Sequence, residues 1–206
     1  MADATSTQRH NLPLLATTET CSGGTYIVTG ANTGLGFEAA KHLVELGAAK
    51  VIMGVRNIGA GEEAKAEIQT ATGILNVAEV WALDLSSYES VRTFAKKAIA
   101  ELDRIDAVIE NAAVAMAQRV LAEGHILPVT VNVYSTFLLG ILLLPKMSES
   151  ARRFGILPHI TIVTSRASFD FQQDWDKIKD DPLAKMDNED MVQLKTYVTF
   201  ILKRSL

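Results

Sequence analysis

The stretch TGANTGLG, residues 29–36, follows the short apolar run TYIV and precedes FEAAKHLVELG. Three glycines, Gly30, Gly34 and Gly36, stand at a turn that leads from a predicted strand into a predicted helix. Because glycine has no Cβ atom, such a turn can approach a pyrophosphate closely, and the N–H groups that open the helix point at the same place. A glycine-rich turn without a ligand is the alternative. The order of strand, turn and helix favours a nucleotide site.

The rest of the chain alternates between apolar runs of strand length and amphipathic segments of helical period. This alternation predicts an α/β fold, a Rossmann-like doubly wound parallel sheet with helices on both faces. Ser87 is expected to cap one helix, and the second helix is expected to begin after the flexible segment GAG. Ligands of such sheets bind beyond the carboxyl ends of the strands. The predicted strands are 25–30, 50–55, 77–85, 106–112 and 159–165, and the predicted helices are 34–46, 62–70, 88–102 and 126–150.

Length and composition limit the classes of protein. A chain of 206 residues with 48% apolar residues is expected to form one globular domain, over residues 23–206, preceded by a flexible arm over residues 1–22. The net charge of −4 provides no basic patch for nucleic acid. The apolar stretch at 136–145 is too short to span a bilayer, and the first 20 residues do not form a secretory signal. We therefore expect a cytoplasmic protein without a membrane span.

Cysteine and histidine do not form a recognisable site. Cys21 is the only cysteine, which excludes a disulfide framework and a thiolate metal cluster. The four histidines show no spacing typical of metal ligands. We expect no metal site, and a reducing compartment is consistent with this cysteine usage.

The glycine spacing G-x-x-x-G-x-G resembles the cofactor turn of the short-chain dehydrogenase/reductase family rather than the common dinucleotide-binding fold. Further segments resemble that family in the same order over about residues 22–200, with Glu110, Ala113 and Thr164 as departures from its usual residues. The likeness is to the retinol-dehydrogenase-like branch common among fungal biosynthetic enzymes. The segments are LDL (83–85), ENAA (110–113), VNVYSTFLLGILLLP (131–145) and ITIVTSRAS (160–168).

The resemblance implies a set of cofactor-binding residues at the ends of the predicted strands. In the family, the Asp-Leu pair contacts adenine and the asparagine after the fourth strand braces the central strands. Taken alone, Asp84 could be a helix cap, and Asn111 and Asn132 could be hydrogen-bonded core amides. The implied residues are Gly30, Asn32, Thr33, Gly34, Leu35, Gly36, Asp84, Leu85, Asn111 and Ala112.

The end of the second predicted strand bears on the choice of cofactor. Enzymes that use NAD place a carboxylate there, about twenty residues after the glycines, to bind the ribose hydroxyls. Val55 occupies this place and Arg56 follows it. A guanidinium can bind a 2′-phosphate with two donors, so the sequence favours NADP(H), with a solvated surface arginine as the alternative.

The family reduces a carbonyl with a serine that holds the oxygen, a tyrosine that supplies the proton and a lysine that lowers the pKa of the tyrosine. The resemblance places the serine at Ser165, the tyrosine at Tyr197 and the active-site asparagine at Asn132. The lysine belongs four residues after the tyrosine, where Ile201 stands. Lys203 lies about 120° away around a regular helix and does not replace it.

Two classes of function follow. The first is an NADPH-dependent oxidoreductase that interconverts a carbonyl and an alcohol on a small organic substrate. The second is a non-catalytic relative that binds nucleotide or pairs with a partner, because the lysine and the family's last strands are missing from this sequence. A foreign tail after about Thr199 would explain both departures. A homodimer is expected through the apolar helix at 126–150.

Overall fold

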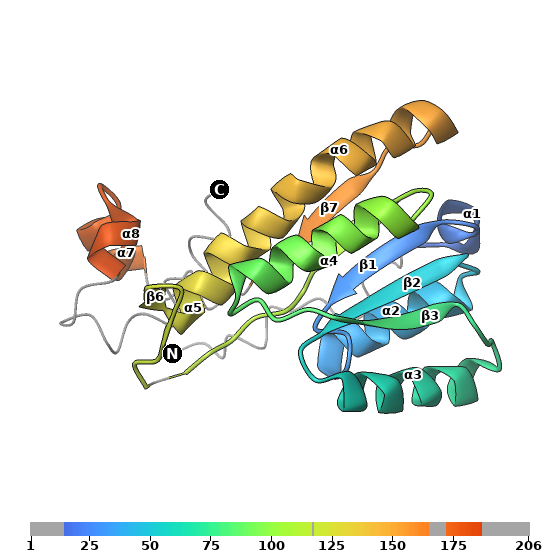
Figure 1. The fold of residues 1–206 in the computed structure, drawn as a ribbon, viewed down its shortest axis with the longest axis horizontal. Helices are drawn as coiled ribbons and strands as arrows, with labels where there is room; N and C mark the ends of the chain where they lie inside the picture. The colour runs from blue at the N-terminus through green and yellow to red at the C-terminus, as the bar shows by residue number, and fades with distance from the viewer. Residues whose placement is uncertain (1–14, 117, 165–171, 187–206) are drawn as a thin grey trace, which may run out of the picture.

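The computed structural model describes residues 15–116, 118–164 and 172–186, and its centre is a five-stranded sheet (Figure 1). The strand order is β3-β2-β1-β4-β7, and every neighbouring pair is parallel. This confirms the predicted Rossmann-like sheet. The strands are β1 (Thr25–Thr29), β2 (Lys50–Val55), β3 (Ala78–Ala82), β4 (Ala107–Glu110) and β7 (His159–Ile162).

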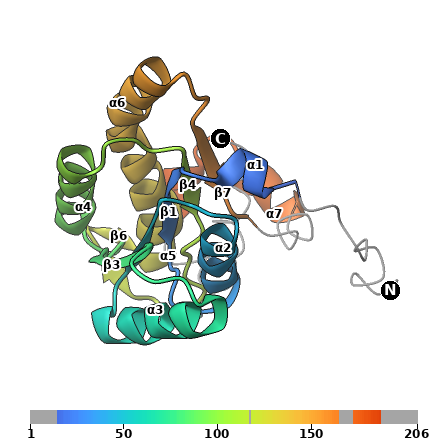
Figure 2. The same cartoon turned by 90° about the vertical axis from the view of Figure 1, so that its right-hand side faces the viewer.

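Helices cover both faces of the sheet (Figure 2). Successive side chains of β1 point to opposite faces of the sheet, and both faces are apolar. Ile27 packs with Phe94 and Leu139 on one face, and Val28 packs with Leu43 on the other. A strand buried on both faces is apolar throughout its centre. The first face carries α4 (Tyr88–Glu101) and α6 (Thr136–Phe154), and the second carries α2 (Gly34–Glu45) and α3 (Ile58–Thr72).

Capping side chains set the helix boundaries. Ser87 caps α4 as predicted, since its Oγ accepts the N–H of Ser90 at 3.3 Å. The predicted start of the second helix at Glu62 was wrong. Asn57 is the N-cap of α3, because its Oδ1 accepts the N–H of Ala60 at 3.1 Å. The helix therefore begins at Ile58 and includes the segment GAG. A Cβ atom on Gly61 would lie 2.6 Å from Val80 Cγ1, so this glycine allows the helix to pack closely on the sheet.

Four strands end earlier than predicted, and β1 does so by one residue, at Thr29 instead of residue 30. Residues 83–85, 111–112 and 163–164 were predicted as strand, but β3 ends at Ala82, β4 at Glu110 and β7 at Ile162. The last residue of that prediction, Ser165, lies outside the described residues. Backbone hydrogen bonds to the neighbouring strand extend one residue further in two of these strands, from the N–H of Leu83 to the carbonyl of Val55 at 2.9 Å and from the N–H of Val163 to the carbonyl of Glu110 at 3.0 Å. Residues 84–85 and 111–112 then form loops at the carboxyl edge of the sheet.

The beginning of the described chain differs from a flexible arm. Thr18–Cys21 forms the short helix α1, where Thr17 and Thr20 make a reciprocal capping box. Cys21 is buried, and its carbonyl accepts the hydroxyl of Tyr26 at 3.1 Å. The arm expected over residues 1–22 is therefore ordered at least from Thr18, while the division of the chain into an arm and one domain stays a prediction.

The predicted helix at 126–150 is a longer helical segment, Leu127–Phe154. By length and composition it could cross a membrane, in contrast to the expectation from residues 136–145, but 61% of its most apolar window is buried. Leu139 and Leu143 are fully buried against the sheet and α4, as in a core helix. The segment consists of α5 (Leu127–Val129), the π-helical η2 (Thr130–Ser135) and α6.

Besides α1, four short elements were not predicted. A two-stranded hairpin precedes α5, and α7 packs against the α5–η2 region through Ile178 and Trp175. The elements are β5 (Leu121–Ala122), β6 (His125–Ile126), α7 (Gln172–Ile178) and α8 (Pro182–Met186).

Candidate nucleotide-binding site

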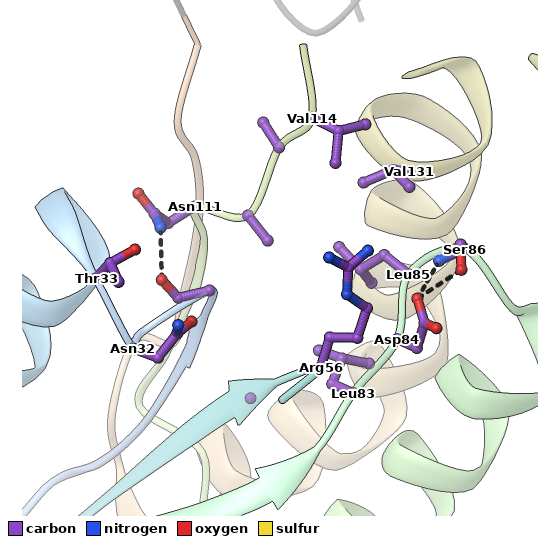
Figure 3. A pocket seen from close by; sticks show the side chains of 14 residues that line it. Asn32, Thr33, Arg56, Leu83, Asp84, Leu85, Ser86, Asn111, Val114 and Val131 are labelled. Carbon is purple, nitrogen blue, oxygen red and sulfur yellow. Dashed lines mark hydrogen bonds between the residues drawn. The ribbon is translucent and has the colours of Figure 1, made fainter. Parts of the chain in front are cut away.

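A cavity of about 430 Å³ opens at the carboxyl edge of the sheet (Figure 3). Loops that follow four neighbouring strands contribute to it, which brings together residues far apart in the sequence. Eight of the predicted cofactor residues line it: Gly30, Asn32, Thr33, Arg56, Asp84, Leu85, Asn111 and Ala112. The other lining residues are Gly54, Leu83, Ser86, Ala113, Val114 and Val131.

Thr29 joins the ends of the two central strands below this cavity. It is fully buried, and its Oγ1 accepts the backbone N–H groups of Asn111 and Ala112, each at 3.0 Å. Asn111 Nδ2 donates in return to the carbonyl of Thr29 at 3.0 Å. Thr29 was not predicted as a site residue, although its place at the end of a buried strand and before a glycine turn indicates such a role.

The three glycines of the turn have two different roles. A Cβ atom on Gly36 would lie 2.5 Å from both Gly30 O and Asn111 Nδ2, so α2 can approach the sheet only because this residue is glycine. Gly30 and Gly34 have φ of +65° and +57°, in the left-handed region that favours glycine. Leu35, by contrast, is 76% exposed in the first turn of α2.

The beginning of α2 faces the cavity. The side chain of Thr33, its N-cap residue, makes no capping hydrogen bond and instead lines the cavity. The positive end of a helix dipole and its first N–H groups form a suitable site for a phosphate. The glycine turn therefore has the geometry of a pyrophosphate site.

The opposite rim is formed by Asp84, Leu85 and Ser86. Asp84 Oδ1 accepts the N–H of Ser86 at 2.9 Å and its hydroxyl at 2.6 Å, so this carboxylate holds a turn (Figure 3). Ser87, not Asp84, is the helix cap. Asp84 thus has a structural role in the rim and still contributes to the cavity lining.

Arg56 is the cation of the site. It follows β2 directly and is exposed, and its side chain extends into the cavity (Figure 3). The guanidinium makes no ion pair with a described residue, while the preceding Val55 is buried and carries no charge. This rim can therefore bind an anion and has no carboxylate at the end of β2.

Asn132 lies behind the cavity rather than in its lining. It is fully buried in η2, where Oδ1 accepts the N–H of Val114 at 2.8 Å and Nδ2 donates to the carbonyl of Val114 at 2.9 Å. The side chain therefore positions the backbone of a residue that does line the cavity. Its predicted part in catalysis stays a prediction.

Replacing Asn132 by leucine is expected to lower the free energy of unfolding by about 2–4 kcal/mol, because the N–H and carbonyl of Val114 would lose a buried partner. Urea denaturation measures the change. The matched control is Ser135→Ala, in the same π-helical segment, because the buried Ser135 Oγ has no hydrogen-bond partner in the described part of the chain. Equal losses in the two variants would contradict the role given to Asn132.

A family model described as short chain dehydrogenase matches residues 25–175, which include the whole sheet and the cavity. The chain belongs to the short-chain dehydrogenase family. This confirms the resemblance drawn from the glycine turn and the segments that follow it.

Two similar members of the short-chain dehydrogenase family come from fungi. The short chain dehydrogenase/reductase dmxR8 of Cryptosporiopsis sp. is 47% identical over 145 residues, which are 70% of this chain and 45% of that protein. The short chain dehydrogenase atnD of Emericella nidulans is 43% identical over 141 residues, 68% of this chain and 45% of that protein. The chain thus spans less than half the length of these two relatives.

The solved structure of the Pseudomonas aeruginosa RhlG/NADP active-site complex has the same fold. It is 25% identical, with a TM-score of 0.61, and the match covers 71% of this chain and 56% of that one. This likeness agrees with a Rossmann-like short-chain dehydrogenase.

The residues predicted for the chemistry of the short-chain dehydrogenase family lie in two parts of the chain. Asn132 is described above, and Ser165 and Tyr197 lie outside the described residues. Within the described ranges, no three or more side chains of His, Cys, Asp or Glu are grouped so that they could hold a metal ion.

Proposed function

We propose that this protein is an NADPH-dependent short-chain oxidoreductase that interconverts a carbonyl and an alcohol on a small organic substrate. The choice of cofactor rests on one observation, the position of Arg56. Its guanidinium is exposed, makes no ion pair with a described residue, and lines the same cavity that the beginning of α2 faces. A guanidinium binds a phosphate with two parallel donors. The likeness to RhlG, whose solved structure is a complex with NADP, supports the same cofactor.

The residues present fit a dinucleotide. Gly30 O and Asn111 Nδ2 lie so close to Gly36 that a Cβ atom there would clash with both. The glycine turn can therefore lie directly against the beginning of α2. The pyrophosphate would lie at the beginning of α2, the adenosine between Arg56 and Leu85, and the nicotinamide toward Val114. When bound, NADPH supplies the hydride for reduction of a carbonyl.

In this proposal, Ser165 holds the substrate oxygen and Tyr197 donates a proton to it as the alcohol forms. Asn132 keeps Val114 in place beside the reacting groups through its two hydrogen bonds. The substrate is a small organic carbonyl or alcohol, and the proposed location is the cytoplasm.

Replacing Arg56 by glutamine is expected to weaken NADPH binding by about tenfold to 100-fold, because a charge-assisted bidentate contact is lost. The affinity for NADH, which has no 2′-phosphate, should change by less than about twofold. Titration followed by nucleotide fluorescence measures both constants.

The control for this titration is Arg152→Gln, which removes an exposed arginine of α6 that bonds Ser148. It should leave both affinities unchanged. Equal weakening of NADPH and NADH by Arg56→Gln would assign the arginine to general charge attraction and would contradict its role at the 2′-phosphate.

A second candidate is a non-catalytic relative that binds nucleotide or pairs with a partner chain. Ile201 in place of the family's lysine favours it, and so do Ile141 and Leu144, which are 62% and 50% exposed on α6. NADPH oxidation with a panel of aldehydes and ketones separates the two. Turnover supports the oxidoreductase, whereas saturable NADPH binding without turnover of any member supports the second candidate.

A further inference from the structure

A second cavity, of about 310 Å³, lies beside α4 and η2. It shares no lining residue with the nucleotide cavity, although Val131 lines the first and Tyr134, on the same π-helical segment, lines the second. Its volume is at the lower end of small-molecule sites, which have roughly 300–1,000 Å³. The lining residues are Tyr88, Arg92, His125, Tyr134 and Leu138.

Hydrogen bonds between distant parts of the chain hold the walls of this cavity. Glu123 Oε1, at the tip of the β5–β6 hairpin, accepts the N–H of Tyr88 at 2.8 Å and so ties the hairpin to the beginning of α4. Thr130 Oγ1 donates to the carbonyl of Ala122 at 2.7 Å and ties the other side of the hairpin to η2. The cavity is thus a built feature of the fold.

Aromatic rings form most of the wall. The rings of His125 and Tyr134 are in contact, with centroids 4.7 Å apart, and Tyr88 adds a third ring from α4. Leu138 adds an aliphatic surface one turn along the helix from Tyr134. Half-buried rings of this kind bind planar aromatic groups by stacking and edge contacts.

Arg92 provides a charge at the mouth of the cavity. It lies four residues after Tyr88 on α4, which puts both side chains on one face of the helix. Arg92 is exposed and makes no ion pair with a described residue, in contrast to Arg104, which pairs with Asp106. A planar guanidinium recognises a carboxylate with two parallel hydrogen bonds.

We propose that this pocket is a second small-molecule site, which binds a planar aromatic monocarboxylate. The ring of the ligand lies against Tyr88 and Tyr134, and its carboxylate pairs with Arg92. A neutral aromatic compound lacks the ion pair, and an aliphatic acid lacks the ring contacts, so both bind more weakly.

The experiment titrates the full chain with 2-naphthoate and follows ligand fluorescence, with the neutral 2-naphthalenemethanol as a matched probe. We expect saturable binding of 2-naphthoate, at least about fivefold tighter than that of the alcohol, because a charge-assisted bidentate pair is present. Arg92→Gln should remove this difference, and Arg92→Lys, which keeps the charge but not the planar fork, should reduce it. Arg152→Gln is the control and should change nothing.

Saturating NADPH distinguishes the two cavities. Naphthoate binding that persists in the presence of NADPH and depends on Arg92 supports the proposal. Displacement by NADPH, or equal sensitivity to Arg56→Gln, would place the probe in the nucleotide cavity and overturn it. The same conclusion follows if folded Arg92→Gln, checked by circular dichroism, binds naphthoate as well as the unchanged chain does, or if no saturable binding occurs.

Discussion

Replacing Gly36 by alanine is expected to abolish NADPH binding in the micromolar range and to lower the free energy of unfolding by about 1–3 kcal/mol. The added Cβ would lie 2.5 Å from Gly30 O and 2.5 Å from Asn111 Nδ2, closer than real Cβ contacts. One of these atoms belongs to the backbone of the turn itself, so the clash is relieved only if the turn or α2 moves. Either movement displaces the N–H groups that would bind the pyrophosphate.

Helix propensity alone would make an alanine variant more stable, because alanine is favoured over glycine by about 1 kcal/mol in a helix interior. Gly140→Ala provides the control, since Gly140 is also buried in a helix but its added Cβ would lie 3.6 Å from Ile160 Cδ1, an ordinary contact. This variant should be stabilised by about 0.5–1 kcal/mol. Urea denaturation and NADPH titration of both variants measure these effects. Equal responses of the two variants would contradict the steric role of Gly36.

Replacing Thr29 by valine is expected to lower the free energy of unfolding by about 1–3 kcal/mol, because two hydrogen bonds are lost and each contributes about 0.5–1.5 kcal/mol. Valine has nearly the same shape, so packing is preserved, but the N–H groups of Asn111 and Ala112 lose the hydroxyl that they share. The N–H of Asn111 keeps its second acceptor, the carbonyl of Ile109 at 3.0 Å. Because residues 111 and 112 line the nucleotide cavity, NADPH affinity should fall as well.

Thr29→Ser keeps the hydroxyl and removes one methyl group, which costs about 1 kcal/mol. Its NADPH affinity should be close to that of the unchanged chain. Urea denaturation and nucleotide titration separate the two variants. If Thr29→Ser lowers the free energy of unfolding and the NADPH affinity as much as Thr29→Val does, the methyl group of Thr29, and not its hydrogen bonds, would hold β1 against β4.

Local patterns were sufficient to predict several parts of the site. Arg56, Asp84 and Asn111 follow apolar runs of strand length, and the carboxyl ends of parallel strands meet at one edge of the sheet. The fold class alone was therefore enough to predict that these three residues lie around one cavity. The cap at Ser87 was equally readable, because a serine before a polar-apolar helical period is a local signal.

Other contributions could not be read from the sequence, because they depend on partners distant along the chain. Asn132 was assigned from its motif, but its side chain is committed to the backbone of Val114, which only the packing of η2 against this loop brings near. The β5–β6 hairpin was missed since each strand has two residues, too few for a period, and it is held by Glu123 and Thr130. The start of α3 was misplaced because a GAG segment has low helix propensity, which the Asn57 cap offsets.

The resemblance of several motifs in order along the chain was enough to identify the family. Hydrophobic period and the three glycines were enough to predict the parallel sheet and the turn, because both are properties of neighbouring residues. The tertiary structure decided which polar atoms meet at the sheet edge. The hydroxyl of Thr29 binds two N–H groups of a loop more than 80 positions away, and the lack of a Cβ on Gly36 matters because Asn111 Nδ2 and the carbonyl of Gly30 lie against it. Hydrogen bonds and close contacts of this kind depend on distances of a few ångströms between segments, and only the packed sheet and helices set those distances.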